Sequence, residues 1–269
     1  MTSTSAPTTA AGPAPVRSPL PQSLAGSTVV IVGGSSGIGL AAGSLLRSVG
    51  ARVVLAGRDE TRLAAAVARV KGGEDGDVLG VPADMTDEGA IEKVFETAGR
   101  VDHVLVTAGS MGGGPLSETP RSAVEDLVAG RIWGAYAAAR VAAAHLPAGG
   151  SITLTSGVYA TRPVPGVAVG AASVAAVEAF TRALAVELAP RRIRANTIRF
   201  GVFDTPLARG VFGIPAGPEG DAAVAAAGEA FLLGRMGTAE EAASAAVFAM
   251  SNTYVTGTVL TVDGGLSLS

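Results

Sequence analysis

The sequence predicts an α/β protein built on one doubly wound parallel sheet of about seven strands, flanked by helices on both faces. Short runs of β-branched residues alternate along the chain with longer Ala-rich stretches. The short runs are apolar throughout, as strands buried on both faces are. Repeated strand–helix–strand order requires right-handed crossovers and therefore a parallel sheet. With 48% hydrophobic but only 4% aromatic residues, the core must be built from Ala, Val, Leu and Ile.

The predicted strands, in chain order, cover residues 28–32, 52–56, 78–81, 103–107, 151–155, 194–199 and 259–262. The predicted helices include residues 60–70, 87–98, 123–146 and 168–188. Asp59 is the expected N-cap of the first of these. A Gly- and Pro-rich stretch over 210–220 interrupts the alternation and predicts a loop, before an Ala-rich helix over 222–232. That loop is either a lid over a substrate or a plain surface loop.

The chain divides into a tail and one domain. Residues 1–22 are rich in Pro, Thr and Ala and show no apolar periodicity, so we expect a disordered tail before a single domain over 23–269. A net charge of −3 gives no reason to expect nucleic acid or a membrane as a partner. With no cysteine and only His103 and His145, neither a Cys-ligated nor a multi-His metal site is possible. We expect a cytoplasmic protein that binds a small molecule and no metal.

A glycine-rich turn follows the first predicted strand. Gly33, Gly37 and Gly39 lead directly into a helix-forming segment, with Ser35, Ser36 and Ile38 between them. A helix that begins directly after a strand offers free N–H groups and the positive end of its dipole to a phosphate. Glycines let that phosphate approach without Cβ clashes. The G-x-x-x-G-x-G spacing therefore predicts a dinucleotide site.

The end of the second predicted strand selects the dinucleotide. In such folds an acidic residue at this point binds the ribose hydroxyls of NAD, whereas an arginine accommodates the 2′-phosphate of NADP. Here Gly57 supplies no carboxylate, and Arg58 supplies a planar guanidinium suited to phosphate. The sequence thus favours NADP(H) over NAD(H).

These pieces resemble the short-chain dehydrogenase/reductase (SDR) family over residues 26–269. The matching segments, in family order, are VGGSSGIG (32–39), AGR (56–58), ADMT (83–86), VTAG (106–109), ALAVELAPRRIRANTI (183–198), FGVFDTP (200–206), RMGTAEEAA (235–243) and VTGTVLTVDGG (255–265). The resemblance implies a single Rossmann-type domain. It also implies roles at the cofactor: Asp84 and Met85 border the adenine, Ala108 and Gly109 line the cofactor, and Thr205 approaches the nicotinamide carboxamide.

The family's catalytic Asn-Ser-Tyr-Lys tetrad is missing from this sequence. Family members place the Tyr and the Lys four residues apart on one helix, but no tyrosine here precedes a lysine by four residues. Alignment from the end of that helix puts Gly170 at the Tyr position and Val174 at the Lys position. It puts Gly157 at the Ser position and Arg131 at the Asn position. The usual mechanism of the family therefore cannot operate.

Three side chains are candidates for a replacement chemistry. Arg131 could supply the positive charge that the lysine normally brings, or clamp a substrate carboxylate or carbonyl; the alternative is a solvated helix arginine. Tyr159 could donate a proton from the rim of the sheet, and Ser156 could donate a hydrogen bond to a substrate. For both, the alternative is a packing role. An iminium substrate, already electrophilic, would accept a hydride without a strong proton donor.

We therefore predict an NADP(H)-dependent oxidoreductase with a non-standard active site that reduces a small carbonyl- or imine-like substrate. The alternative is an NADP(H)-binding protein without redox turnover: a pseudoenzyme or regulatory module, or a non-redox cyclase or isomerase. The resemblance also implies a homotetramer, with a dimer as the alternative. The Ala-rich helices over 123–146 and 168–188 and the C-terminal VLTVDGG segment would form its interfaces.

Overall fold

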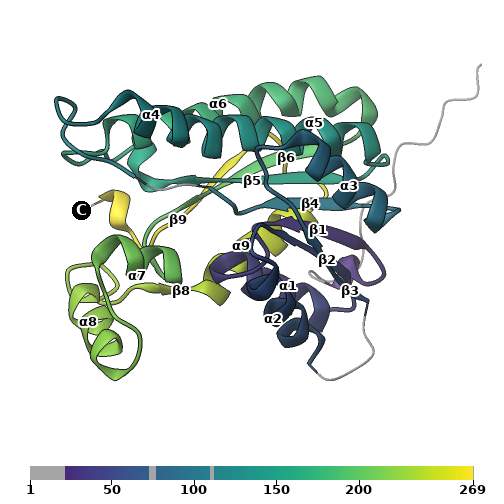
Figure 1. Cartoon of the computed structure of the whole chain (residues 1–269). Helices are drawn as coiled ribbons and strands as arrows, with labels where there is room; N and C mark the ends of the chain where they lie inside the picture. The colour runs from purple at the N-terminus through teal and green to yellow at the C-terminus, as the bar shows by residue number, and fades with distance from the viewer. Residues whose placement is uncertain (1–21, 73–76, 110–111, 269) are drawn as a thin grey trace, which may run out of the picture.

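A computed structural model of the chain describes residues 22–72, 77–109 and 112–268. Its main sheet has seven strands, all parallel, in the order β3-β2-β1-β4-β5-β6-β9 (Figure 1). The doubly wound α/β sheet predicted from the sequence is therefore confirmed. The predicted disordered tail, residues 1–22, lies outside the described residues apart from Gln22, which opens a short 3₁₀ turn, Gln22–Leu24.

The seven strands are β1 (Thr28–Val32), β2 (Arg52–Gly57), β3 (Val78–Pro82), β4 (His103–Val106), β5 (Ser151–Gly157), β6 (Arg194–Phe200) and β9 (Val259–Val262). The strand order reverses at β1, whose neighbours are β2 and β4. In open α/β sheets the crevice for a ligand opens at such a reversal, beyond the carboxyl ends of the strands. The glycine-rich turn after β1 stands at this point.

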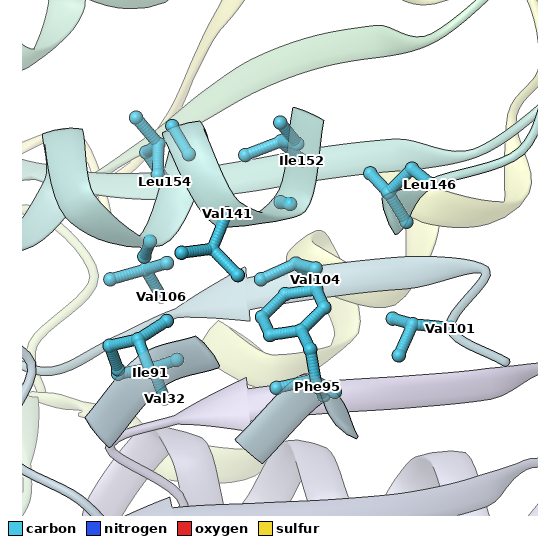
Figure 2. Close-up of a cluster of buried hydrophobic side chains, with 14 of the residues drawn as sticks. Val32, Ile91, Phe95, Val101, Val104, Val106, Val141, Leu146, Ile152 and Leu154 are labelled. Atoms are coloured by element: carbon cyan, nitrogen blue, oxygen red, sulfur yellow. The ribbon is translucent and has the colours of Figure 1, made fainter. Parts of the chain in front are cut away.

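Helices cover both faces of the sheet (Figure 1). On one face lie α1 (Gly37–Ser48), α2 (Glu60–Lys71) and α9 (Ala239–Ser251), and on the other lie α3 (Glu88–Ala98), α5 (Gly134–His145) and α6 (Ala168–Leu188). Each layer encloses an apolar core. Figure 2 shows part of the core under α3 and α5, where the Phe95 ring lies among Val, Ile and Leu side chains of the strands and helices. As expected, Phe95 is the one aromatic among the largest fully buried side chains of the described residues.

Three predicted elements differ from the structure. The helix expected over 123–146 consists of α4 (Arg121–Val128), a π-helical turn (Ala129–Trp133) and α5. The expected loop over 210–220 is helical at both of its ends, where α7 (Pro206–Phe212) finishes and α8 (Pro218–Gly228) begins. The helix expected over 222–232 is α8, which begins and ends four residues earlier. Pro218, one of the two prolines of this stretch, begins α8, and Pro206 begins α7; a proline at the first position of a helix loses no hydrogen bond, because the N–H there has no partner in the helix. Pro215, the other proline of the stretch, lies between the two helices. Both helices lie together at one end of the sheet (Figure 1).

One helical stretch of the described chain, Ala168–Arg191, is long and apolar enough to cross a membrane. It consists largely of α6, which packs on β5 and β6 and buries Val174, Val177, Leu184 and Leu188 toward them. Its apolar residues are thus those of a core helix.

Candidate active site

The glycine-rich turn after β1 packs tightly against the end of β4. Gly33 has a φ of +92°, and a Cβ added there would lie 2.4 Å from the backbone nitrogen of Ala108. A Cβ on Gly39 would lie 2.2 Å from the carbonyl oxygen of Gly33. Thr107, which stands where the family has Asn, donates from Oγ1 to that same carbonyl at 3.1 Å. Only glycine fits at these two positions, so the close-packed turn is built into the sequence.

A cleft of about 430 Å³ opens at this turn beside the N-terminus of α1. Every residue expected to bind the cofactor lines it: Gly33, Ser35, Ser36, Gly37, Ile38, Gly39, Arg58, Asp84, Met85, Ala108, Gly109 and Thr205. The cleft combines a helix N-terminus with a glycine cradle that an added Cβ would fill. These features suit the pyrophosphate of a dinucleotide.

Two arginines border the far end of this cleft. Arg58 is exposed, and its Nη1 lies 3.8 Å from Oδ2 of Asp84. Asp59 accepts a hydrogen bond from the backbone N–H of Arg62 at 2.8 Å, which confirms it as the N-cap of α2. Arg62 also lines the cleft. This second arginine was not among the residues predicted to bind the cofactor, although its place in the first turn of the helix that follows Arg58 could have indicated it.

Asp84 is held by its own turn. Its Oδ1 accepts from the backbone N–H of Thr86 at 2.9 Å and from the Thr86 hydroxyl at 2.8 Å. The backbone hydrogen bond lowers the pKa of the Asp84 carboxyl most, with help from the hydroxyl and from Arg58. Asp84 therefore stays ionised, with its negative charge near Arg58 at the mouth of the cleft.

A second cavity of about 470 Å³ adjoins the cleft. The two share Ile38, Thr107, Thr205 and Leu207 in their walls. Apolar side chains dominate the lining of the second cavity: Leu127, Val158, Val167, Val174, Phe200, Phe203, Val211 and Phe212. Such a cavity suits the apolar body of a substrate placed next to a bound dinucleotide.

The positions aligned with the family's Ser, Tyr and Lys all face this cavity. Gly157, Gly170 and Val174 line it, whereas Lys71 ends α2 and Lys93 lies on α3, both exposed. A Cβ on Gly170 would lie 3.2 Å from the carbonyl oxygen of Gly112. A larger side chain at 170 would thus have to displace backbone, which makes a simple reversion to tyrosine unfavourable.

Arg131 lies where the cleft and the cavity meet. It belongs to the π-helical turn Ala129–Trp133, a type of distortion often found at functional sites. Its guanidinium packs on Gly109, where an added Cβ would lie 2.6 Å from Cζ. Burial lowers the pKa of Arg131 to about 10, so the side chain keeps its charge at neutral pH.

Tyr159 and Ser156 line the same cavity but differ in their hydrogen bonding. Tyr159 lies in a short 3₁₀ turn (Val158–Ala160), is half-buried, and its hydroxyl has no hydrogen-bond partner among the described residues. Ser156 donates from Oγ to Oε1 of Glu178 at 2.7 Å. The expected hydrogen bond from Ser156 to a substrate is therefore wrong in direction, because the proton already goes to Glu178 and only lone pairs remain.

The other hydroxyls of the cavity wall also donate their protons in hydrogen bonds within the protein. They donate to chain carbonyls: Thr107 to Gly33, Thr155 to Val106, Ser173 to Gly170 and Thr205 to Phe203. Among the described residues that line the cavity, Tyr159 thus carries the one hydroxyl whose proton has no acceptor within the described part of the chain. If a side-chain hydroxyl protonates a ligand here, the geometry favours Tyr159.

A buried ion pair supports this wall. Arg199 on β6 donates to both carboxylate oxygens of Glu178 on α6, from Nε at 2.8 Å and from Nη2 at 2.7 Å. The Glu178 side chain is 7% exposed and the Arg199 side chain is 16% exposed. Burial alone would raise the pKa of Glu178, but the hydrogen bonds from Arg199 and Ser156 lower it overall. Sequence analysis missed this pair, although charges inside an apolar strand and on the inner face of a core helix could have indicated it.

Replacing Glu178 by glutamine should destabilise the fold by about 3 kcal/mol, because a buried charge then loses its partner. Since the pKa of Glu178 is lowered in the folded state, the loss should be present above the ordinary carboxyl pKa of 4.5 and fade as the pH falls below it. Urea unfolding at fixed protein concentration, repeated over a range of pH, measures the loss of stability and its pH dependence. Glu187→Gln, an exposed site on the same helix, is the matched control. Equal midpoints for the two variants would contradict a role of the pair in stability.

Comparison with known proteins identifies the family. The family model described as "Enoyl-(Acyl carrier protein) reductase" matches residues 32–267. Carbonyl reductase family member 4 of Danio rerio is 35% identical over 247 residues, covering 89% of this chain and 97% of the relative. The chain belongs to the short-chain dehydrogenase/reductase family, an oxidoreductase family whose members bind nicotinamide cofactors and small-molecule substrates.

Solved structures agree with this assignment. A short-chain dehydrogenase from Burkholderia cenocepacia, in complex with NADP, has a TM-score of 0.80 and 29% identity over 91% of this chain and 99% of its own. The MalC Reductase/Diels-Alderase of Malbranchea aurantiaca has a TM-score of 0.82 and 29% identity over 92% of this chain and 99% of its own.

Proposed function

We propose that the chain is an NADP(H)-dependent oxidoreductase with a non-standard active site that reduces a small carbonyl- or imine-like substrate. The supporting observation is the shared wall between the arginine-bordered cleft and the apolar cavity. A dinucleotide in the cleft would bring its nicotinamide to this wall and supply a hydride. The cavity would hold the substrate and keep water away from it.

The preference for NADP(H) rests on the far end of the cleft. Arg58 and Arg62 offer guanidinium groups to a 2′-phosphate, and Gly57 offers no carboxylate to ribose hydroxyls. A Cβ on Gly57 would lie 3.0 Å from Oγ of Ser35, so the turn itself occupies the space next to this position. The NADP-bound relative from Burkholderia cenocepacia is consistent with this preference.

Three residues would act on the substrate. Arg131 would stabilise negative charge as it develops on the oxygen, since its guanidinium lies at the junction of cleft and cavity. Tyr159 would donate the proton. Ser156, held by Glu178, would accept a hydrogen bond from the substrate. In this proposal the three residues take over the roles of the family's Asn-Ser-Tyr-Lys tetrad, and no lysine takes part.

A non-redox role is the second candidate. A structural relative is named both a reductase and a Diels-Alderase, so this fold can carry a cyclising activity next to a reductive one. A regulatory NADP(H)-binding protein would bind the cofactor in the same cleft and would catalyse no reaction in the apolar cavity.

The two candidates differ in turnover. We expect the purified protein to oxidise NADPH with members of a panel of ketones, quinones and cyclic imines, seen as falling absorbance of the reduced nicotinamide. Tight NADPH binding with no oxidation across the panel would support the non-redox role instead.

We also propose a cytoplasmic homotetramer, with a dimer as the alternative. Trp133 and Tyr136 are 59% and 42% exposed beside α6, and β9 at the sheet edge is only half-buried. Exposed aromatics and an open edge strand suit subunit contacts. Light scattering at micromolar concentration should give a tetramer or a dimer, and a monomer would contradict both.

A further inference from the structure

The helix α7 forms part of the wall of the apolar cavity, but its own packing does little to hold it there. Leu207, Val211 and Phe212 of this helix line the cavity. The helix is seven residues long, lies between its N-cap Thr205 and Gly213, and none of its residues is buried. So short a helix is unstable by itself, because most helical stability in proteins comes from packing. Other contacts must therefore keep α7 at the cavity.

Those contacts converge on Arg209, a residue of α7 that does not line the cavity. Its Nε donates to Oδ1 of Asp204 at 2.6 Å, and its Nη2 donates to Oδ2 of the same carboxylate at 2.8 Å. Nη2 also donates to Oδ1 of Asp221 at 2.7 Å, and Nη1 donates to the carbonyl oxygen of Pro215 at 3.3 Å. All three nitrogens of this guanidinium thus have an acceptor.

The acceptors come from three different parts of the chain. Asp204 belongs to the short strand β7 (Phe203–Asp204), which is the element that α7 contacts most extensively among the described residues. Pro215 lies in the connection between α7 and α8, and Asp221 lies in the first turn of α8. Arg209 therefore ties α7, the connection and α8 to one strand.

The pair of Arg209 with Asp204 is partly sheltered from water. The Arg209 side chain is 21% exposed and the Asp204 side chain is 33% exposed. The hydrogen bonds from Arg209 lower the pKa of the Asp204 carboxyl, so this group stays ionised at neutral pH. An arginine bound through two nitrogens to one carboxylate is fixed in orientation as well as in charge. The pair therefore favours one position of α7 on β7.

We propose that Arg209 is a positioning residue for the substrate: through Asp204 and Asp221 it holds α7 as a fixed wall of the cavity. Arg209 does not touch the substrate, but it determines where the apolar side chains of α7 stand. The inference rests on the proposed function, because that function places the substrate in this cavity. The position of α7 can nevertheless be measured without turnover.

Hydrogen–deuterium exchange of Arg209→Met in saturating NADP⁺ measures how firmly α7 is held. We expect the backbone amides of α7 to exchange at least about tenfold faster than in the wild type, while those of α6 are unchanged. Asp204→Asn should give part of this effect and should add little to Arg209→Met, because both changes remove the same contact. Arg209→Lys keeps the charge and should restore part of the protection. Arg121→Met, which breaks an exposed ion pair with Glu125 in α4, is the matched control and should leave α7 unchanged.

A neutral apolar dye, N-phenyl-1-naphthylamine, fluoresces in apolar surroundings and reports on the cavity itself. We expect its dissociation constant to rise about tenfold in Arg209→Met, and that of NADPH to change less than about threefold. For any compound that the protein reduces, KM should rise by a similar factor with little change in kcat, because Arg209 does not line the cavity. The urea midpoint should stay close to that of the wild type, since no residue of α7 is buried.

Unchanged exchange of α7 in Arg209→Met would overturn the inference, as would faster exchange with an unchanged affinity for the dye. Equally faster exchange in α6, together with a lower urea midpoint, would assign Arg209 to the stability of the whole fold and would also overturn the inference. Failure of the proposed function looks different: exchange and dye binding would respond as expected while no compound supports NADPH oxidation.

Discussion

Replacing Arg58 by alanine is expected to weaken NADPH binding about 30-fold and to change NADH binding by less than about threefold. A guanidinium hydrogen bond to a phosphate is stabilised by both charges, and only NADPH carries a phosphate at the adenosine ribose. Arg58 is exposed at the mouth of the cleft, so its replacement leaves no cavity in the core. Fluorescence titration with each cofactor measures the two dissociation constants.

Arg69→Ala is the control for Arg58, because it removes an exposed charge from the last turn of α2, away from the cleft. It should leave both dissociation constants unchanged. Arg62→Ala should reproduce part of the Arg58 effect, and the double variant should show no preference for NADPH. Equal loss of NADPH and NADH in Arg58→Ala would refute the proposed NADP(H) preference.

Replacing Tyr159 by phenylalanine is expected to lower kcat for a carbonyl substrate about 100- to 10,000-fold, the range typical of a general acid. The reason is that the other hydroxyls of the cavity already donate their protons elsewhere: Ser156 donates to Glu178, and the threonines and Ser173 donate to backbone carbonyls. NADPH binding should stay within about twofold of the wild type, because Tyr159 lies in the cavity and not in the cleft.

Tyr136→Phe is the control for Tyr159. Tyr136 lies on the outer side of α5, packs edge-on against Trp133, and does not line the cavity. Its replacement should leave kcat unchanged. If Tyr159→Phe also retained full kcat, the proton would come from another source, and Tyr159 would have only a packing role.

The parts of this site that depend on local sequence could be predicted. The turn at Gly33 to Gly39, the strand end at Gly57 and Arg58, and the cap at Asp59 are each formed by residues that are close neighbours in sequence. Their roles follow from backbone geometry that neighbouring residues determine. For the same reason the alternation of strands and helices was sufficient to predict the doubly wound sheet.

The parts that depend on distant contacts could not be predicted. Glu178 and Arg199 are 21 residues apart in sequence, and only the packing of α6 on β6 brings them together. That pair reverses the expected direction of the Ser156 hydrogen bond. The contact of Gly112 with Gly170 likewise depends on a loop crossing the start of α6. Proline and glycine over 210–220 suggested a loop, because the same residues that break helices also begin and end them.

Transfer of deuterium tests the central claim most directly. NADPH carrying deuterium at either the 4R or the 4S position of the nicotinamide is incubated with the enzyme and a carbonyl compound from the panel, and the product is analysed by mass spectrometry. We predict one deuterium on the former carbonyl carbon with one of the two labelled cofactors and none with the other, and much less labelled product in Tyr159→Phe over the same time. A product that is unlabelled with both cofactors, or an unchanged substrate beside tightly bound NADPH, would contradict an oxidoreductase and indicate the non-redox role.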